Sequence, residues 1–134
     1  MLAESLQTEE SSVSIAVKRV YEPAAKSDGY RILVDRLWPR GLKKEDAALD
    51  LWSKELAPSA ALRLWFDHEA ARWEAFRHRY AAELDARAEH WRPLLARAAR
   101  QRVTLLFGAR DEEHNNAVAL KMYLDAMSRS HGAA

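Results

Sequence analysis

Two runs of consecutive apolar residues constrain the fold most. Ile32, Leu33 and Val34 follow one another within residues 30–37, and residues 103–107 read VTLLF before Gly108. Successive residues of a strand point to opposite faces of a sheet, so an unbroken apolar run implies burial on both faces. Strands of this kind are typical of a parallel sheet that is covered by helices.

A further strand and a long helical region complete the expected fold. Residues 15–21, IAVKRVY, are rich in β-branched side chains and precede a turn-like segment, EPAAKSDG. Strands separated by helices predict an α/β fold with a small, mostly parallel sheet of about three strands, covered by helices in Rossmann-like layering. The first connection is short, so the first two strands could instead pair antiparallel. Their apolar character favours the parallel arrangement.

Helical periodicity and capping residues locate the helices. Asp46 or a neighbour could open a short helix that carries Leu49 and Trp52. Ser59 is a candidate N-cap for residues 60–66, and Asp111 is a candidate N-cap for residues 112–127. Apolar residues at spacings of three and four predict two further helices, within 69–86 and 91–99. The stripe of the first of these consists of Trp73, Phe76, Tyr80 and Leu84.

Length and composition restrict the class of protein. A chain of 134 residues predicts one domain, residues 14–128, between flexible tails at 1–13 and 129–134. The net charge of +1 gives no overall attraction to nucleic acid. The chain has no cysteine, which fits a cytoplasmic location, and no apolar run approaches a membrane span. Nothing in the sequence indicates an oligomeric state.

Two polar loops follow the predicted strands. Residues 35–44 read DRLWPRGLKK, and residues 108–116 read GARDEEHNN. Ligands of α/β proteins bind beyond the carboxyl ends of the strands, so we expect these loops to meet at a site. Asp35, Arg36 and Arg40 would then face Arg110, Asp111, His114, Asn115 and Asn116.

The arginines suggest an anionic ligand. Arg36 and Arg40 could each hold a phosphate or carboxylate through two hydrogen bonds. Alternatively, Arg36 pairs internally with Asp35, Asp111 or a helix carbonyl, and Arg40 faces water. Lys54 could extend the anion site or pair with Asp50.

The acidic and aromatic residues allow both functional and structural roles. Asp35 and Asp111 could act as a general acid/base pair or bind ribose hydroxyls. The structural alternatives are a salt bridge for Asp35 and a helix cap for Asp111. His114 could transfer protons, or be a surface or capping histidine. Trp38 could line an aromatic pocket or anchor its loop, and Asn115 is a further candidate ligand-binding residue.

Several kinds of site are not indicated by the sequence. The five histidines form neither an HxH nor an HExxH pair, so no zinc site is expected. The glycine-rich fingerprints of dinucleotide sites and P-loops are missing, and no cofactor is expected.

The longer motifs resemble a known family. The motifs are KRVY, GYRILVDRLWPRG, LWSKELAPSAALRLWF, WEAFRHRYAAEL and VTLLFGARDEEHNNAVALKMYL. Together they resemble domain of unknown function 488, of the YeaO-like type, over roughly residues 15 to 125. The resemblance implies a small bacterial cytoplasmic α/β protein and no particular reaction. FGAR before Asp111 departs from the tyrosine-serine-alanine-lysine-like string expected there. The family pattern falls on Asp35, Arg36, Trp38, Pro39, Arg40, Gly41, Trp52, Lys54, Pro58, Ser59, Asp111, Asn115 and Ala117.

Three functional hypotheses follow. The first is a small-molecule enzyme, such as a hydrolase, or a binder of an anionic, phosphate- or nucleotide-like ligand at the strand-end loops. The second is a nucleic-acid-binding or regulatory protein that uses the basic loop at 35–44; the near-neutral net charge disfavours it. The third is a buried polar network whose role is structural, with function depending on a protein partner.

Overall fold

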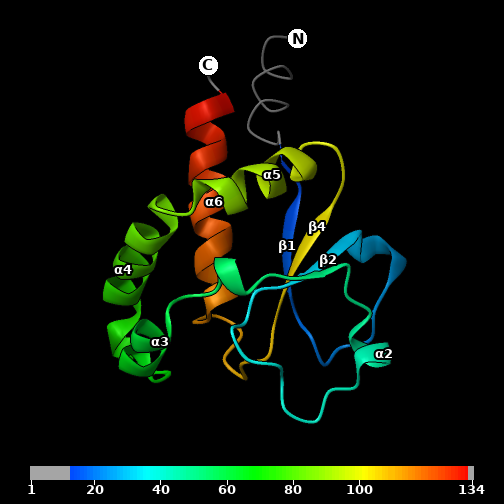
Figure 1. The fold of residues 1–134 in the computed structure, drawn as a ribbon, viewed down its shortest axis with the longest axis horizontal. Coiled ribbons are helices and arrows are strands. Elements are labelled where there is room, and N and C mark those ends of the chain that lie inside the picture. The colour runs from blue at the N-terminus through cyan, green and yellow to red at the C-terminus, as the bar shows by residue number, and fades with distance from the viewer. Residues whose placement is uncertain (1–12, 133–134) are drawn as a thin grey trace.

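The protein has an α/β fold with four parallel strands. The computed structural model describes residues 13–132. The strands are β1 (Ile15–Arg19), β2 (Tyr30–Leu33), β3 (Leu51–Trp52) and β4 (Val103–Phe107), and their order in the sheet is β1-β4-β2-β3 (Figure 1). The predicted fold class is therefore confirmed, with one strand more than expected.

The last strand in the sequence lies inside the sheet. β4 pairs with β1 through Ile15 and Val103, and with β2 through Tyr30 and Val103. β1 and β2 are parallel, as preferred, but they do not pair with each other because β4 separates them. All five residues of β4 are buried, as its predominantly apolar sequence predicts.

The prediction of a helix around residues 46–52 is wrong about where the helix begins and ends. The helix is α2 (Lys44–Ala47), and its N-cap position is Lys43 rather than Asp46. Its C-cap residue is Ala48, whose φ of 47° is left-handed. Leu51 and Trp52 instead form β3, which pairs with Ile32 and Leu33 of β2. Pairing with a neighbouring strand overrides the local helical pattern here.

Four longer helices follow, and two expectations about them are confirmed. They are α3 (Ala60–Phe66), α4 (Trp73–Asp85), α5 (Ala88–Ala98) and α6 (Asn116–Gly132), with 3-10 turns at Lys26–Asp28, Lys54–Leu56 and Ala70–Arg72. Ser59 caps α3, because its hydroxyl accepts a hydrogen bond from the Leu62 N–H at 3.1 Å. The predicted stripe of α4 faces the core: Phe76, Tyr80 and Leu84 are buried and Trp73 is half-buried.

The last helix begins later than expected. Asp111 does not cap it. The side chain of Asn115 does, by accepting from the Val118 N–H at 2.9 Å. Asp111 forms a turn before the helix, where one carboxylate oxygen accepts from the N–H groups of Glu113 and His114. At the other end, residues 129–132 of the expected tail belong to α6. Residues 1–12 and 133–134 lie outside the described residues.

Hydrophobic residues pack on both faces of the sheet. Ile32 and Leu105 belong to the main core, which includes residues of α3, α4, α5 and α6. Leu33 and Leu106 point the other way, into a smaller cluster with Ala47 of α2. The large helices thus cover one face, and α2 with its adjoining loops covers the other (Figure 1).

None of the helices within residues 13–132 has the length and apolar character needed to span a bilayer.

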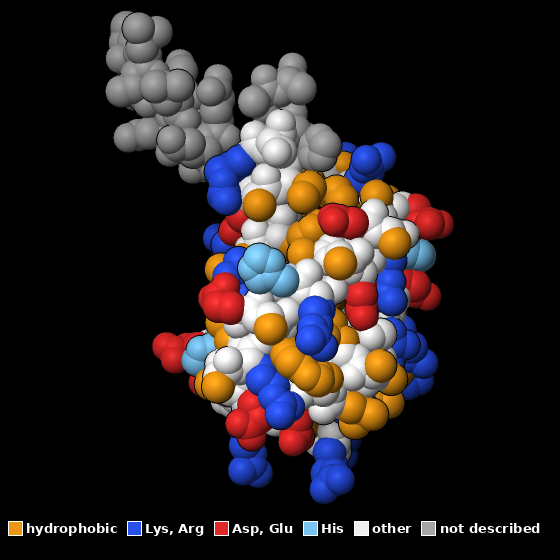
Figure 2. Space-filling model, turned by 90° about the vertical axis from the view of Figure 1, so that its left-hand side faces the viewer, with side chains coloured by type: hydrophobic (Ala, Val, Ile, Leu, Met, Phe, Trp, Pro, Cys, Tyr) orange, Lys and Arg blue, Asp and Glu red, His pale blue; other side chains and the backbone are white. Residues whose placement is uncertain are grey.

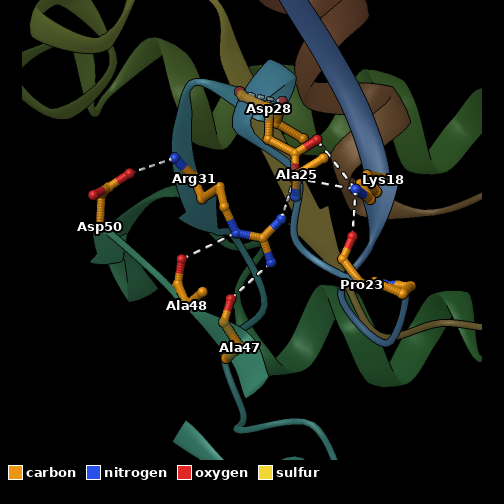
Figure 3. A network of polar contacts seen from close by, with 9 residues as sticks. Lys18, Pro23, Ala25, Asp28, Arg31, Ala47, Ala48 and Asp50 are labelled. Atoms are coloured by element: carbon orange, nitrogen blue, oxygen red, sulfur yellow. Dashed lines mark hydrogen bonds and ion pairs between the residues drawn. The ribbon is translucent and has the colours of Figure 1, made fainter. Parts of the chain in front are cut away.

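A buried ionic network ties the start of β2 to its surroundings (Figure 3). We call Lys18, Asp28 and Arg31 the Asp28 network. Arg31 is 4% exposed, and its guanidinium contacts the Asp28 carboxylate at 2.5 Å and the carbonyls of Ala47 and Ala48 at 2.7 and 3.0 Å. Lys18 contacts Asp28 at 3.0 Å. This network was not predicted from the sequence.

Candidate functional site

A cavity of about 490 Å³ lies at the carboxyl ends of β2 and β4, near the start of α6. We call it the strand-end cavity. Residues of both predicted loops line it, which confirms that the two loops meet. Its acidic, basic and histidine lining residues are Asp35, Arg36, Arg40, Arg63, Asp67, His68 and His114.

Asp35 joins the ends of two strands to the last helix. One carboxylate oxygen accepts from the Gly108 N–H at 2.9 Å, and the other from the Asn116 side-chain amide at 3.2 Å. Its backbone carbonyl accepts from the Trp52 indole at 2.7 Å. Within the described part of the chain Asp35 forms no salt bridge, so the structural role expected as an alternative for Asp35 is not observed.

Burial raises the pKa of the Asp35 carboxyl. The hydrogen bonds from Asn116 and Gly108, and the positive charge of Arg63, act in the opposite direction without cancelling the effect of burial. Asp35 is thus a carboxyl group in the wall of a cavity, held in position by neutral donors.

The loop after β2 directs two arginines to the cavity. The Arg36 Nε donates to the Pro58 carbonyl at 3.1 Å, so this contact is internal, but its partner is none of the expected ones, Asp35, Asp111 or a helix carbonyl, and it involves only one of its nitrogens. Arg40 is exposed and lines the cavity. Trp38 fixes the loop, because its indole donates to the Leu42 carbonyl at 2.8 Å and its ring lies 5.3 Å from that of Trp52. Trp38 therefore anchors its loop and also lines the cavity.

The loop after β4 contributes His114 but not Asp111. The His114 Nδ1 lies 3.0 Å from an Asp111 carboxylate oxygen. Hydrogen bonds from the backbone N–H groups of Glu113 and His114, and the His114 side chain, hold the pKa of Asp111 below its usual value despite partial desolvation. Asp111 is not among the cavity residues, so the expected pair of Asp35 and Asp111 does not meet there. Asp111 instead orients His114, whose ring lies 5.2 Å from that of Trp73.

Two other predicted residues have different surroundings from those expected. Asn115 lines the cavity, but its side chain is engaged in capping α6 and in donating to the Asp111 carbonyl at 2.9 Å. Lys54 lies outside the cavity, with its ammonium 4.3 Å from the centre of the Trp52 ring. It does not pair with Asp50, whose carboxylate accepts from the Arg31 N–H.

The sequence reasoning missed the contribution of α3. Arg63 lies on this helix, and Asp67 and His68 follow it; all three line the cavity. Asp67 and His68 have φ values of 47° and 56°, which is uncommon for residues other than glycine. The Ser59 cap predicted the helix, but no local signal predicted that its far end would return to the strand ends.

Exposed apolar side chains surround the basic residues of the cavity. Leu37 and Leu64 line it and are 59% and 68% exposed. Figure 2 looks onto the side of α3 and α4 and shows apolar side chains among Lys and Arg side chains. Within residues 13–132, no cluster of three or more acidic or histidine side chains has an arrangement that could hold a metal ion.

Comparison with known proteins identifies the family. A family model described as the inactive DUF488-N3 subclade matches residues 14–133. The chain belongs to the DUF488 family. The resemblance inferred from the motifs is therefore confirmed.

The curated DUF488 relatives are bacterial and described as uncharacterised. YeaO of Escherichia coli K12 is 47% identical over 115 residues, which cover 86% of this chain and all of YeaO. Rv3073c of Mycobacterium tuberculosis H37Rv is 46% identical over 70 residues, which cover 52% of this chain and 59% of Rv3073c. Mb3100c of Mycobacterium bovis matches to the same extent. No solved structure matches the chain.

Proposed function

We propose that this protein binds a small phosphate-bearing anion in the strand-end cavity. The observation that carries the proposal is the meeting of Arg36, Arg40 and Arg63 in one concave site. Guanidinium groups match phosphate oxygens in geometry and charge. The volume, about 490 Å³, is within the usual range for small-molecule sites.

The arginines keep most of their donors available. Among the described residues, the only hydrogen bond from the Arg36 side chain is that from Nε to Pro58. The guanidinium groups of Arg40 and Arg63 have no hydrogen-bond partner within residues 13–132, which leaves them available to a ligand. The first turn of α6 begins beside them, and its partial positive charge favours an anion at the same place.

Binding without turnover is better supported than hydrolysis. The matching family model is described as an inactive subclade. Asp111, the expected partner of Asp35 in acid/base catalysis, lies outside the cavity. The nucleic-acid alternative has less support, since Arg36 and Arg40 line a concave site rather than an open basic surface.

Isothermal titration calorimetry with ribose 5-phosphate and with inorganic phosphate tests the proposal. We expect Arg63→Ala to weaken binding at least tenfold, about 1.4 kcal/mol. Arg110→Ala is the matched control, because it removes the same charge from an exposed residue that does not line the cavity. The proposal would be contradicted if the two variants lost equal affinity for the phosphate. It would also be contradicted if neither phosphate bound to the unmodified protein.

A further inference from the structure

The strand-end cavity holds hydrogen-bond acceptors as well as cations. Each Asp35 carboxylate oxygen accepts one hydrogen bond from the protein, whereas a carboxylate offers about four acceptor positions in all. No Lys or Arg within the described residues forms an ion pair with it. Asp35 therefore keeps acceptor capacity in the wall of the cavity.

Neighbouring side chains add further acceptors. The Asn116 amide nitrogen donates to the Val34 carbonyl at 2.6 Å and to Asp35 at 3.2 Å, while its amide oxygen has no hydrogen-bond partner within residues 13–132. The His114 Nδ1 is engaged with Asp111, and Nε2 has no hydrogen-bond partner in the same part of the chain. In a neutral imidazole whose Nδ1 carries the proton, Nε2 is an acceptor.

Asp35 brings a negative charge to a cavity that three arginines also line. A phosphate beside the Asp35 carboxylate would suffer like-charge repulsion, which is strong where water is excluded. The phosphate therefore belongs with the arginines, and the group beside Asp35 must be a hydrogen-bond donor. Phe66 and Phe76 also line the cavity and offer apolar surface to the carbon skeleton of a ligand.

We infer that the ligand is a hydroxylated organic phosphate, a sugar phosphate or a nucleotide, whose hydroxyl group donates to Asp35 while its phosphate binds the arginines. This inference rests on the proposed function and deepens it. A hydroxyl satisfies a carboxylate acceptor without placing a second negative charge beside it. An alkyl phosphate of similar size cannot do so.

A ligand series on the unmodified protein tests the inference by calorimetry at fixed ionic strength. We expect ribose 5-phosphate to bind at least tenfold more tightly than propyl phosphate, which lacks hydroxyl groups. If propyl phosphate binds as tightly as ribose 5-phosphate, the inference is overturned, while the anion site stands if Arg63→Ala still weakens binding.

The two sources of such a ligand are distinguishable. Adenosine 5′-monophosphate binding tenfold more tightly than ribose 5-phosphate would identify a nucleotide, and equal binding would identify a sugar phosphate; either result supports a hydroxylated phosphate. Failure of every phosphate to bind would reject the proposed function itself.

Asp35→Asn provides a second test, because it replaces one acceptor oxygen with a donor. We expect the variant to lose the preference for ribose 5-phosphate over propyl phosphate, while its affinity for propyl phosphate is kept or rises. A variant that retains the full tenfold preference overturns the inference. The ligand series decides the question alone if circular dichroism shows that the variant does not fold.

Discussion

An arginine and an aspartate lie at or near each end of β2. The pair at the beginning has many more protein partners than the pair beyond the other end. At the beginning, Arg31 is buried and its guanidinium contacts Asp28 and two backbone carbonyls. Beyond the other end, Arg36 makes one side-chain hydrogen bond, to Pro58, and faces the cavity. The same residue type thus completes an internal network in one place and leaves donors available in the other.

The two aspartates differ in the same way. Burial acts to raise the pKa of Asp28, but bonds from the Ala25 N–H, Lys18 and Arg31 outweigh it, and the pKa lies below its usual value. Burial likewise raises the pKa of Asp35, and there the neutral donors do not overcome it. The two regions contain the same residue types. They differ in how completely protein partners fill the hydrogen-bonding capacity of the side chains, and this difference separates a structural ion network from a candidate site.

The largest expected effect is on the Asp28 network. Arg31→Ala removes one partner of a buried ion pair and the donors to Ala47 and Ala48, so we expect a loss of about 3–5 kcal/mol in the free energy of unfolding. Arg36→Ala removes one hydrogen bond at a half-buried side chain, and we expect a loss of about 1 kcal/mol or less. Urea denaturation measures both. Similar losses would contradict the distinction between the two ends of β2.

Two glycines extend the comparison to the backbone. Gly29 adjoins Asp28, has a φ of 66°, and a Cβ there would lie 2.2 Å from the Arg102 carbonyl oxygen. We expect Gly29→Ala to cost more than about 2 kcal/mol, since strain and a backbone clash combine. Gly41, in the cavity loop, has a φ of 74° and open space around it, so Gly41→Ala should cost about 1 kcal/mol. Equal changes in thermal unfolding would show that Gly29 is not closely packed.

The smallest expected effect is a difference in pH dependence. The pKa of Asp28 in the folded protein lies below 3.8, the ordinary aspartate pKa, so folded Asp28 loses its proton at a lower pH than unfolded Asp28. As pH rises through this range, the contribution of Asp28 to the free energy of unfolding therefore increases. The pKa of Asp35 is raised in the folded protein, so unfolded Asp35 loses its proton at a lower pH than folded Asp35. The contribution of Asp35 to the free energy of unfolding therefore decreases as pH rises from 3.8 to this raised pKa.

Unfolding free energies of the unmodified protein, Asp28→Asn and Asp35→Asn between about pH 3 and 7 measure these contributions. We subtract the unfolding free energy of each variant from that of the unmodified protein. We expect this difference to grow with pH for Asp28→Asn and to shrink with pH for Asp35→Asn. Slopes of the same sign would mean that the two carboxyl groups have similar environments.

The sequence predicted the parallel sheet because Ile32, Leu33 and Val34 have no polar side that could face water. It predicted α3 because Ser59 has a local partner, the Leu62 N–H. β3 was not predictable, since two residues carry no pattern and Leu51 and Trp52 are extended only through pairing with β2.

The candidate site was partly predictable for a related reason. Asp35, Arg36, Arg40 and His114 lie in the loops that follow β2 and β4, so the ends of parallel strands bring them together. Arg63 and His68 reach the cavity only through the packing of α3, and such a long-range contact leaves no local signal. Asp111 was misassigned because the turn before α6 and a helix cap use the same residue type.

The position of β4 has a consequence for how the protein folds. β4 pairs with both β1 and β2, yet all of α3, α4 and α5 precede it in the chain. During synthesis, β1 and β2 leave the ribosome without the strand that joins them, and the N–H and C=O groups that pair with β4 stay unpaired until residues 103–107 emerge. Closing so long a loop is a slow step. The late arrival of this strand makes the nascent chain most prone to aggregate just before its sheet can form.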